Sequence, residues 1–414
     1  MKAKVLNWAQ QFSTFCFLDN HEYELAPHSE ECILAAGVRK SIVCPAGQAL
    51  QELDDFIEKH KGWLFGHLGY DLKNEIESLS SSHPDRVGFP DLYFFVPEVV
   101  IRFSNNKMEI DATDPQKIYD EIINKSVSDD MNFPLNGKIY SGMSKEGYIE
   151  VIRHLKEHIL KGDCYEINFC MEFLSENVQL NPLAIYSKLS HVSPNPFSAL
   201  YRMNDKWLIC ASPERFLKKT GSKILSQPMK GTSRRVNTDL QTDIANKEIL
   251  SQSEKDRAEN VMVVDLVRND LARVCKEGSV HVDELFGVYS FPQVHQMVST
   301  VSGVLEEHVS FGDIIRATFP MGSMTGAPKK SVMELIEKYE KNKRGIFSGA
   351  VGYISPNRDF DFNVVIRSIM YNSSSLSLSF QAGSGITFYS DPDIEWEECL
   401  LKAEAIKKVL QSEN

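Results

Sequence analysis

The chain has 414 residues, of which 42% are hydrophobic and 25% charged, and its formal net charge is −12. This composition is that of a globular protein with ample core-forming residues. The acidic balance argues against a nucleic-acid binder, because such proteins concentrate Lys and Arg to replace the counterions of the phosphate backbone. A small anionic ligand would therefore need a local basic pocket.

The cellular compartment is indicated by two patterns. Eight cysteines are spread along the chain without a Cys-x-x-Cys pair, which disfavours zinc and disulfide sites. Residues 1–20 contain polar side chains where a signal peptide needs an apolar core, and no apolar run reaches membrane-spanning length. We therefore expect a cytoplasmic protein with reduced thiols and no membrane partner.

The first region, residues 1–140, alternates short apolar runs with glycine and proline breakers. Residues 92–103 predict one long strand interrupted at Pro97. Residues 129–142 are polar and contain Gly and Pro, which makes them the best candidate for a boundary. We expect an N-terminal region of residues 1–140, interlocked with a second domain of residues 141–414.

The second region begins with a helix, because apolar side chains recur at helical spacing from Tyr148 to Leu160, with Ser144 suited to the N-cap and Gly162 to the end. Helices are also expected over 239–272 and after Pro328 and Pro392. Strands are expected at 164–174, 207–211, 223–227, 347–354, 362–371 and 376–388. Helices and strands mix without a regular βαβ rhythm, which predicts an α+β fold.

The run Pro228-Met229-Lys230-Gly231-Thr232 places one lysine between a proline and a glycine. It predicts a strand end that turns sharply, because Pro228 fixes its own φ and Gly231 permits unusual backbone geometry. Lys230 would then project from a stiff loop. It would be a nucleophile if partial burial lowered its pKa, since the ammonium must lose its proton before it attacks. An ordinary solvated lysine is the alternative.

Two predicted helices carry paired carboxylates at i, i+3 spacing, Asp256 with Glu259 and Glu395 with Glu398, and Lys402 lies on the face of the second pair. Two such helices would hold one hard divalent cation. Magnesium suits oxygen ligands, and no His/Cys cluster offers zinc a site. Solvated acidic helix faces are the alternative.

Anion recognition is indicated by glycine-containing turns at 320–329, 349–353 and 382–385, although none matches a P-loop or dinucleotide fingerprint. Arg367 is a lone cation in a predicted apolar strand. It is either a core-edge arginine with an acidic partner or a bidentate clamp for a carboxylate. A magnesium site, an arginine, backbone amides and a lysine together describe a pocket for a small di- or tricarboxylate.

Seven motifs occur in a fixed order along the second region, at residues 228–232, 265–271, 322–329, 349–353, 366–368, 382–386 and 395–402. In this order the chain resembles the chorismate-utilising enzymes, and among them component I of the aminodeoxychorismate synthases, which act in the para-aminobenzoate branch of folate synthesis. The strong matches cover residues 144–412. The resemblance implies an α+β fold of antiparallel sheets packed in layers with helices outside.

The resemblance also implies roles for individual residues. Lys230 would be the covalent nucleophile, and Glu214 the general acid or base near the departing hydroxyl. The substrate would be contacted by Gly231, Thr232, Gln296, Phe347, Gly349, Arg367, Gly383, Ser384, Gly385 and Lys402.

The implied cofactor is Mg²⁺, held by Glu259 and Glu398 with Asp256 and Glu395 as outer or water-mediated partners. The implied reaction converts chorismate and ammonia to 4-amino-4-deoxychorismate through a lysine intermediate. Ammonia would come from glutamine through a separate amidotransferase subunit in a heterodimer, because the chain shows no glutaminase segment.

Several positions depart from relatives. Lys230 stands where anthranilate synthases carry alanine, and Glu166 where isochorismate and salicylate synthases carry a water-activating lysine and many ammonia-using relatives carry glutamine. Gln296 replaces a family histidine, and Phe347 an aromatic position that is usually Tyr or Trp. The alternatives are anthranilate synthase component I and a non-catalytic regulatory relative.

Overall fold

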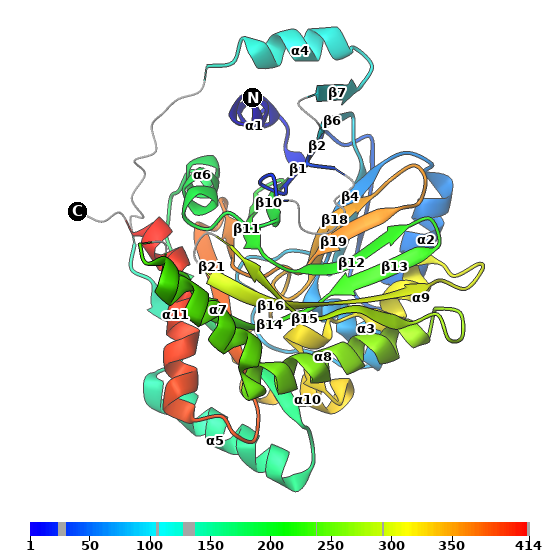
Figure 1. Cartoon of the computed structure of the whole chain (residues 1–414). Coiled ribbons are helices and arrows are strands. Elements are labelled where there is room, and N and C mark those ends of the chain that lie inside the picture. Colours follow the sequence, from blue (N-terminus) through cyan, green and yellow to red (C-terminus); the bar gives the residue numbers. More distant parts are fainter. Residues whose placement is uncertain (24–29, 105–106, 127–136, 237, 292–293, 412–414) are drawn as a thin grey trace.

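The computed structural model describes residues 1–23, 30–104, 107–126, 137–236, 238–291 and 294–411. Within these residues the strands form an 11-stranded sheet and a 10-stranded sheet, and neighbouring strands such as β1 (Thr14–Asp19) and β10 (Phe197–Met203) run antiparallel. Helices lie outside the sheets (Figure 1), so the α+β prediction is confirmed.

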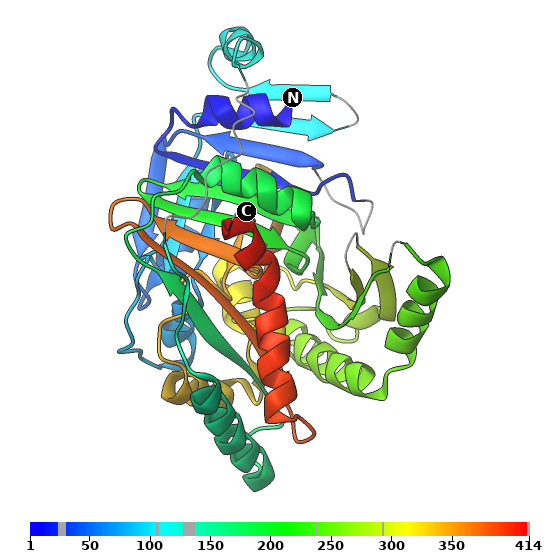
Figure 2. The ribbon, with the colours of Figure 1, turned by 90° about the vertical axis from the view of Figure 1, so that its left-hand side faces the viewer.

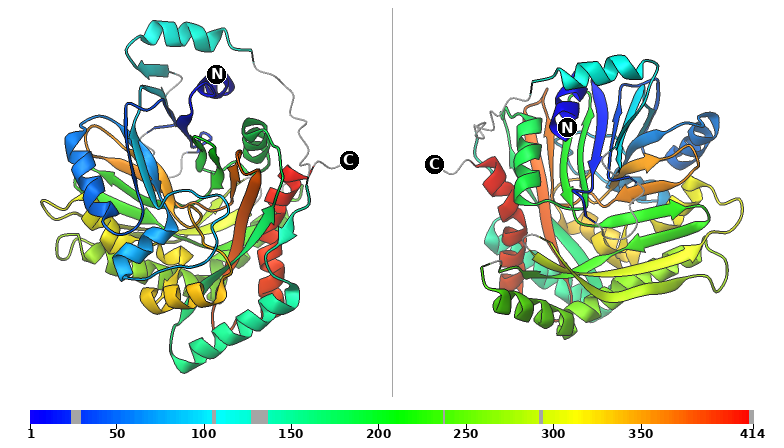
Figure 3. Two further views of the ribbon diagram at one scale, coloured as in Figure 1. Left: turned by 180° about the vertical axis from the view of Figure 1, so that it is seen from behind. Right: turned by 45° about the horizontal axis from the view of Figure 1, so that its top comes forward.

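The 11-stranded sheet mixes strands from both ends of the chain. Its order is β17 (Gly326–Ala327), β9 (Glu166–Ser175), β21 (Ser377–Ile386), β20 (Ser368–Asn372), β11 (Lys206–Ser212), β10 (Phe197–Met203), β1 (Thr14–Asp19), β2 (Cys32–Ala36), β6 (Val99–Ser104) and β7 (Lys107–Asp111), with β8 (Tyr140–Ser141) beside β9. The blue N-terminal strands lie beside green and orange strands of the second region (Figure 3).

The 10-stranded sheet is mixed in the same way. Its order is β14 (Met229–Arg234), β16 (Val294–Val304), β13 (Lys223–Gln227), β12 (Arg215–Thr220), β19 (Phe360–Asn363), β18 (Ala350–Ile354), β4 (Leu64–Leu68), β5 (Leu92–Val96) and β3 (Lys40–Cys44), with β15 (His281–Ser290) beside β16. Residues before 140 thus contribute strands to both sheets.

The helices cover the outer faces. They are α1 (Lys2–Ala9), α2 (Ala49–Lys59), α3 (Lys73–Glu77), α4 (Pro115–Ile123), α5 (Lys145–Lys161), α6 (Pro182–Val192), α7 (Leu240–Gln252), α8 (Glu254–Ala272), α9 (Phe311–Thr318), α10 (Lys329–Tyr339) and α11 (Pro392–Leu410), with short 3₁₀ turns at Tyr70–Leu72 and Gly322–Met324. α11 crosses the 11-stranded sheet beside α5 and α6 (Figure 2), whereas α7 and α8 pack on β14 and β16.

Two hydrophobic cores follow from the alternation of side chains along the strands. In β1, Cys16 points into a core shared with the 10-stranded sheet, whereas Phe15 and Phe17 point into a second core under the outer helices. The helix predicted from Ser144 to Gly162 is confirmed, because Ser144 accepts a hydrogen bond from the Gly147 amide and Gly162 ends α5 with a φ of +84°.

Two predicted strands are wrong in an informative way. Residues 92–103 are not one strand, because β5 and β6 lie in different sheets. Residues 362–371 likewise divide into β19 and β20, again in different sheets. Each interruption is a crossover that carries the chain from one sheet to the other, and the candidate site depends on two such crossovers.

The remaining outcomes concern boundaries and compartment. The predicted boundary at 129–142 falls partly on residues 127–136, which lie outside the described residues. None of the described helices is long and apolar enough to cross a membrane. All eight cysteines are buried and free of disulfide bonds.

Candidate active site

Side chains from both sheets meet at the candidate site. Lys230 comes from β14 of the 10-stranded sheet, and Glu166 comes from β9 of the 11-stranded sheet. Glu214 and Arg367 lie in two of the crossovers that join the sheets, between β11 and β12 and between β19 and β20. The way in which the chain changes sheets therefore brings together residues that are far apart in the sequence.

Lys230 lies inside a strand and not in the predicted loop. β14 and β16 shift register between Met229 and Thr232, and Gly231 within this irregularity has a φ of +86°, a conformation that favours glycine. A side chain at Gly231 would also meet Asp256 at 2.9 Å. The lysine is thus fixed by a strand irregularity packed against α8.

The ammonium of Lys230 contacts the carboxylate of Glu166, with Nζ 2.5 Å from Oε1. Burial of Lys230 disfavours the charge, but the nearby carboxylates, chiefly Glu166 and Glu259, outweigh it and raise the pKa of the lysine. The condition stated for a nucleophilic Lys230, a pKa lowered by burial, is therefore not met in the ligand-free protein. Lys230 is an ammonium in the ligand-free protein and must lose a proton before it can attack.

Glu214 is almost fully buried and lines a largely apolar cavity with Val267, Leu271 and Met321. Desolvation raises the pKa of its carboxyl to about 7, although Lys230 opposes the shift. A carboxyl with this pKa is protonated in a large fraction of molecules near neutral pH, which is what a general acid needs.

Arg367 was predicted to lie in a strand. It lies instead in the crossover between β19 and β20, with a φ of +50°. Among the described residues its guanidinium makes no ion pair within 4.0 Å. Burial lowers its pKa to about 10, and Glu214 is the carboxylate that counteracts this. A half-buried arginine without a contacting carboxylate leaves its donor fork available for an anionic ligand.

Residues 382–385, predicted as a turn, instead lie within the last part of strand β21 and pair with β9. A side chain at Gly385 would lie 2.6 Å from Glu166 Oε1 and 2.8 Å from Lys230 Nζ, so only glycine leaves this pair undisturbed. Ser384 has a buried hydroxyl. Lys402 donates to the Gly383 carbonyl at 2.9 Å and pairs with Glu398, so it is already engaged at the rim.

The predicted magnesium ligands lie on α8 and α11, but the described residues hold no group of three or more His, Cys, Asp or Glu close enough for a metal ion. Glu259 and Glu395 each lie 3.9 Å from Lys255 Nζ, and each has a buried oxygen without a hydrogen-bond partner. Desolvation raises the pKa of Glu259 to about 7. These two carboxylates, each with an unpartnered oxygen beside the Lys255 ammonium, are the kind of oxygen donors that a hard metal cation binds.

Both predicted carboxylates of α11 lie on the side of Lys255. Glu395 lies 3.9 Å from its Nζ, and Glu398, which pairs with Lys402 at 2.7 Å, has its pKa lowered by Lys402 and also by Lys255. Asp256 packs against Gly231. The magnesium site itself stays a prediction.

Gln296 and its neighbour His295 project to opposite sides of β16. Gln296 is buried, its Nε2 lies 3.4 Å from Thr232 Oγ1, and its Oε1 has no partner. His295 instead contacts Asp243 at 3.2 Å and Ser290 at 2.8 Å. Gln296 is therefore the member of this pair that faces the Lys230 strand.

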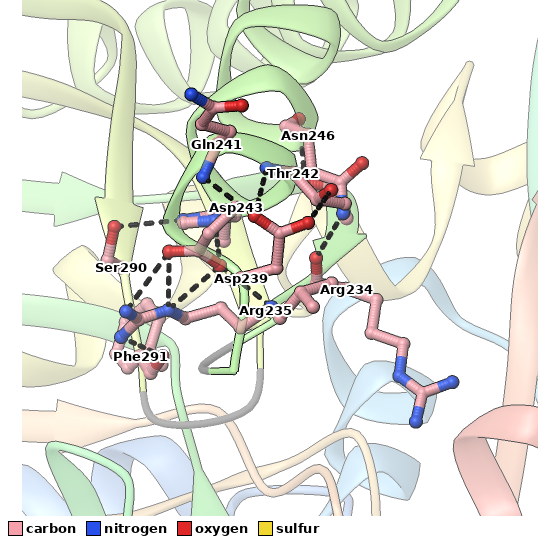
Figure 4. Close-up of polar contacts among 12 residues, drawn as sticks. Arg234, Arg235, Asp239, Gln241, Thr242, Asp243, Asn246, Ser290 and Phe291 are labelled. Carbon is pink, nitrogen blue, oxygen red and sulfur yellow. Dashed lines mark hydrogen bonds and ion pairs between the residues drawn. The ribbon is translucent and has the colours of Figure 1, made fainter.

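Asp243 anchors the end of the Lys230 strand. It accepts hydrogen bonds from the Arg235 guanidinium and the Val236 amide, in addition to its contact with His295. Arg235 also donates to the Phe291 carbonyl (Figure 4). This network ties β14, α7 and the β15–β16 hairpin together.

Phe347 and Gly349 lie behind the site. Phe347 is buried in the core between the sheets, and a side chain at Gly349 would lie 2.1 Å from the Leu68 carbonyl. The Val365 amide donates to the Gly349 carbonyl, two residues before Arg367. Phe347 and Gly349, both predicted to contact the substrate, therefore pack behind the site and support the crossover that carries Arg367.

The match of this chain to known proteins agrees with this geometry. A family model described as chorismate binding enzyme matches residues 8–408. The chain belongs to the chorismate-binding enzyme family. The names of its relatives therefore indicate which reactions of chorismate are candidates for this chain.

Curated relatives of this chain include aminodeoxychorismate synthases and anthranilate synthases. Aminodeoxychorismate synthase component 1 of Bacillus subtilis is 31% identical over 87% of this chain and 78% of its own length. Anthranilate synthase component 1 of Thermus thermophilus is 33% identical over 84% of this chain and 78% of its own length. A probable chloroplastic aminodeoxychorismate synthase of rice is 34% identical over 84% of this chain, which spans 43% of the rice protein.

Among solved structures, anthranilate synthase component I of Streptococcus pneumoniae superposes with a TM-score of 0.82 at 25% identity, covering 94% of each chain. The layered α+β architecture expected of a chorismate-utilising enzyme is therefore confirmed. The names of the relatives do not by themselves separate the two chemistries, because both occur at similar identity.

Sequence reasoning missed one residue that contacts Lys230. Glu166 attracted notice as a departure from relatives, not as a partner of the lysine. Its available signal was a charged residue at the start of a strand, β9, that is otherwise largely apolar. A pairing across two sheets could not be read from sequence spacing.

Proposed function

We propose that this chain is the chorismate-aminating component of an aminodeoxychorismate synthase, which replaces the C4 hydroxyl of chorismate with an amino group. The proposal is carried by Lys230 of β14, which lies among the carboxylates of Glu166 in the other sheet, Glu259 on α8 and Glu214 in the β11–β12 crossover. Curated component 1 relatives with the same name support it. The anthranilate synthase relatives make that activity the second candidate.

In the proposed reaction, Arg367 binds one substrate carboxylate through its free donor fork. Lys230 attacks ring carbon C2 while the C4 hydroxyl departs, and Glu214 gives that hydroxyl its proton so that it leaves as water. Ammonia then forms a bond to C4, the bond between C2 and the lysine nitrogen breaks, and the new ammonium group at C4 returns a proton to Glu214. Two successive allylic displacements keep the configuration at C4.

The cofactor proposed for this site is magnesium. When bound, it would supply positive charge that polarises the ring carboxylate of chorismate. Glu259 and Glu395 would hold it through their unpartnered oxygens, with Glu398 and Asp256 as nearby carboxylates. Gly383 and Gly385 would let the substrate approach the backbone of β21.

We also propose that ammonia comes from a glutamine amidotransferase subunit, since the relatives named component 1 are by name parts of larger enzymes. A cytoplasmic location suits the free cysteines. Free ammonium would replace the partner subunit in vitro.

The test is product analysis. The purified chain is mixed with chorismate, Mg²⁺ and ammonium, with and without an aminodeoxychorismate lyase. The proposal expects para-aminobenzoate only in the tube with lyase, and a rate at least about 10³-fold lower for Lys230→Ala. Anthranilate formed without lyase would instead establish the second candidate.

A further inference from the structure

The contact between Glu166 and Lys230 has features that a structural ion pair does not need. The two side chains are 3% and 11% exposed, and a single 2.5 Å contact joins them. The second oxygen of Glu166, Oε2, is buried and has no hydrogen-bond partner among the described residues. The backbone at Gly385 lies against both groups, which excludes any other side chain from this point.

The charges around Lys230 explain why it needs a nearby proton acceptor. Carboxylates face it from β9 through Glu166, from α8 through Glu259, from the β11–β12 crossover through Glu214 and from α11 through Glu398. They keep its nitrogen protonated in the ligand-free protein. Of these four carboxylates, Glu166 is the one that contacts the nitrogen, and its short contact gives a direct path for a proton.

Building on the proposed function, we propose that Glu166 is the catalytic base that takes the proton from Lys230 as the lysine attacks chorismate. The Nζ–H bond breaks, an O–H bond forms on Glu166, and the freed electron pair forms the bond to C2. When ammonia bonds to C4, the bond between C2 and the lysine nitrogen breaks, the lysine leaves as a neutral amine, and Glu166 returns the proton to it. The base therefore ends each cycle unchanged.

This assignment gives Glu166 a consequence for pH dependence. The proton moves between two groups of the protein, so formation of the neutral, reactive lysine does not require exchange of that proton with solvent. Without the base, a neutral lysine would form only by loss of its proton to water. At pH values below the pKa of the lysine, the population of the neutral form would then rise about tenfold for each unit by which the pH increases.

The test compares Glu166→Gln with the wild type and with a matched control, Glu172→Gln. Glu172 is a buried carboxylate on the same strand, but it bonds Ser379 and lies 3.8 Å from Arg86. The value of kcat/KM for chorismate is measured from pH 6 to pH 9 with Mg²⁺ and a fixed concentration of un-ionised ammonia, which removes the titration of ammonia from the comparison.

We expect Glu166→Gln to be about 100-fold slower than the wild type at pH 6, with the deficit shrinking about tenfold per pH unit until the two rates are equal above about pH 8. Glu172→Gln should give a ratio to the wild type that does not change with pH. A constant ratio for Glu166→Gln, or a complete loss of rate at every pH while chorismate still binds, would overturn the role of base. A wild type that produces no aminodeoxychorismate would instead overturn the proposed function, and the role of Glu166 with it.

Discussion

Two buried ion pairs of this protein differ in how completely their atoms are bonded. In the first, Arg344 binds both oxygens of Glu340 and also donates to the Met324 and Asn168 carbonyls. Glu340 accepts a further bond from the Cys170 amide. The second pair, Lys230 and Glu166, has one contact and an unpartnered oxygen.

The comparison separates two uses of buried charge. A saturated pair has no capacity left for a ligand, and it holds loops and strands in one arrangement. An unsaturated pair keeps a donor, an acceptor and a mobile proton available to a substrate. The Arg344 pair therefore serves the fold, and the Lys230 pair serves the proposed chemistry.

The largest expected effect breaks the saturated pair. Arg344→Met leaves Glu340 charged and buried, so it should lower the free energy of unfolding by about 3–5 kcal/mol. Glu166→Gln removes a carboxylate that is under-satisfied and should change that free energy by less than about 1 kcal/mol. Urea unfolding of both variants checks this, and equal losses would contradict the distinction.

A second effect depends on pH. The pKa of Glu214 in the folded protein is raised to about 7 from the ordinary 4.5, so the folded state holds this proton more tightly than the unfolded chain. The resulting penalty is absent below pH 4.5 and complete above pH 7. Glu214→Gln should therefore gain about 3 kcal/mol of stability at pH 8 and under about 1 kcal/mol at pH 5.

The measurement is the urea midpoint of wild type and variant at the two pH values, each with its own unfolding slope. A gain of the same size at pH 5 and pH 8 would show that burial does not hold the proton on Glu214. Amination should fall in the same variant, because an amide has no acidic proton to give the leaving hydroxyl.

The smallest expected effect sharpens the comparison at the backbone. Gly385→Ala places a methyl group 2.6 Å from Glu166 Oε1 and 2.8 Å from Lys230 Nζ. Displacing the pair should reduce kcat for amination about 100-fold. Gly62→Ala is the matched control, because nothing lies within 4 Å of its added carbon. Steady-state rates check the pair, and equal rates would contradict the contact.

Much of the fold could be predicted from local sequence. The cap residues Ser144 and Gly162 fix the ends of α5, and periodicity locates the other long helices. The crossovers could not be predicted, because apolar residues continue through 92–103 and 362–371 while the chain changes sheets. The same limit applies to Arg367, whose positive φ depends on tertiary contacts.

The residues of the candidate site could be predicted from the sequence, but their protonation states and contacts could not. Motif order indicated Lys230, Glu214 and Arg367 from the resemblance, and the structure brings them together at the junction of the sheets. The protonation of Lys230 was not predictable, because its partner Glu166 lies 64 residues away in another sheet. The pairing of Glu259 with Glu395 around Lys255 depends equally on how α8 and α11 meet.

The most direct test of the central claim is a search for the covalent intermediate. The chain is mixed with chorismate and Mg²⁺ without ammonia, quenched in acid and digested, and its peptides are analysed by mass spectrometry. The account predicts a substrate adduct, chorismate less one water, on Lys230 of the wild type and none in Lys230→Ala. A wild type that aminates chorismate while Lys230 stays unmodified under these conditions would contradict it.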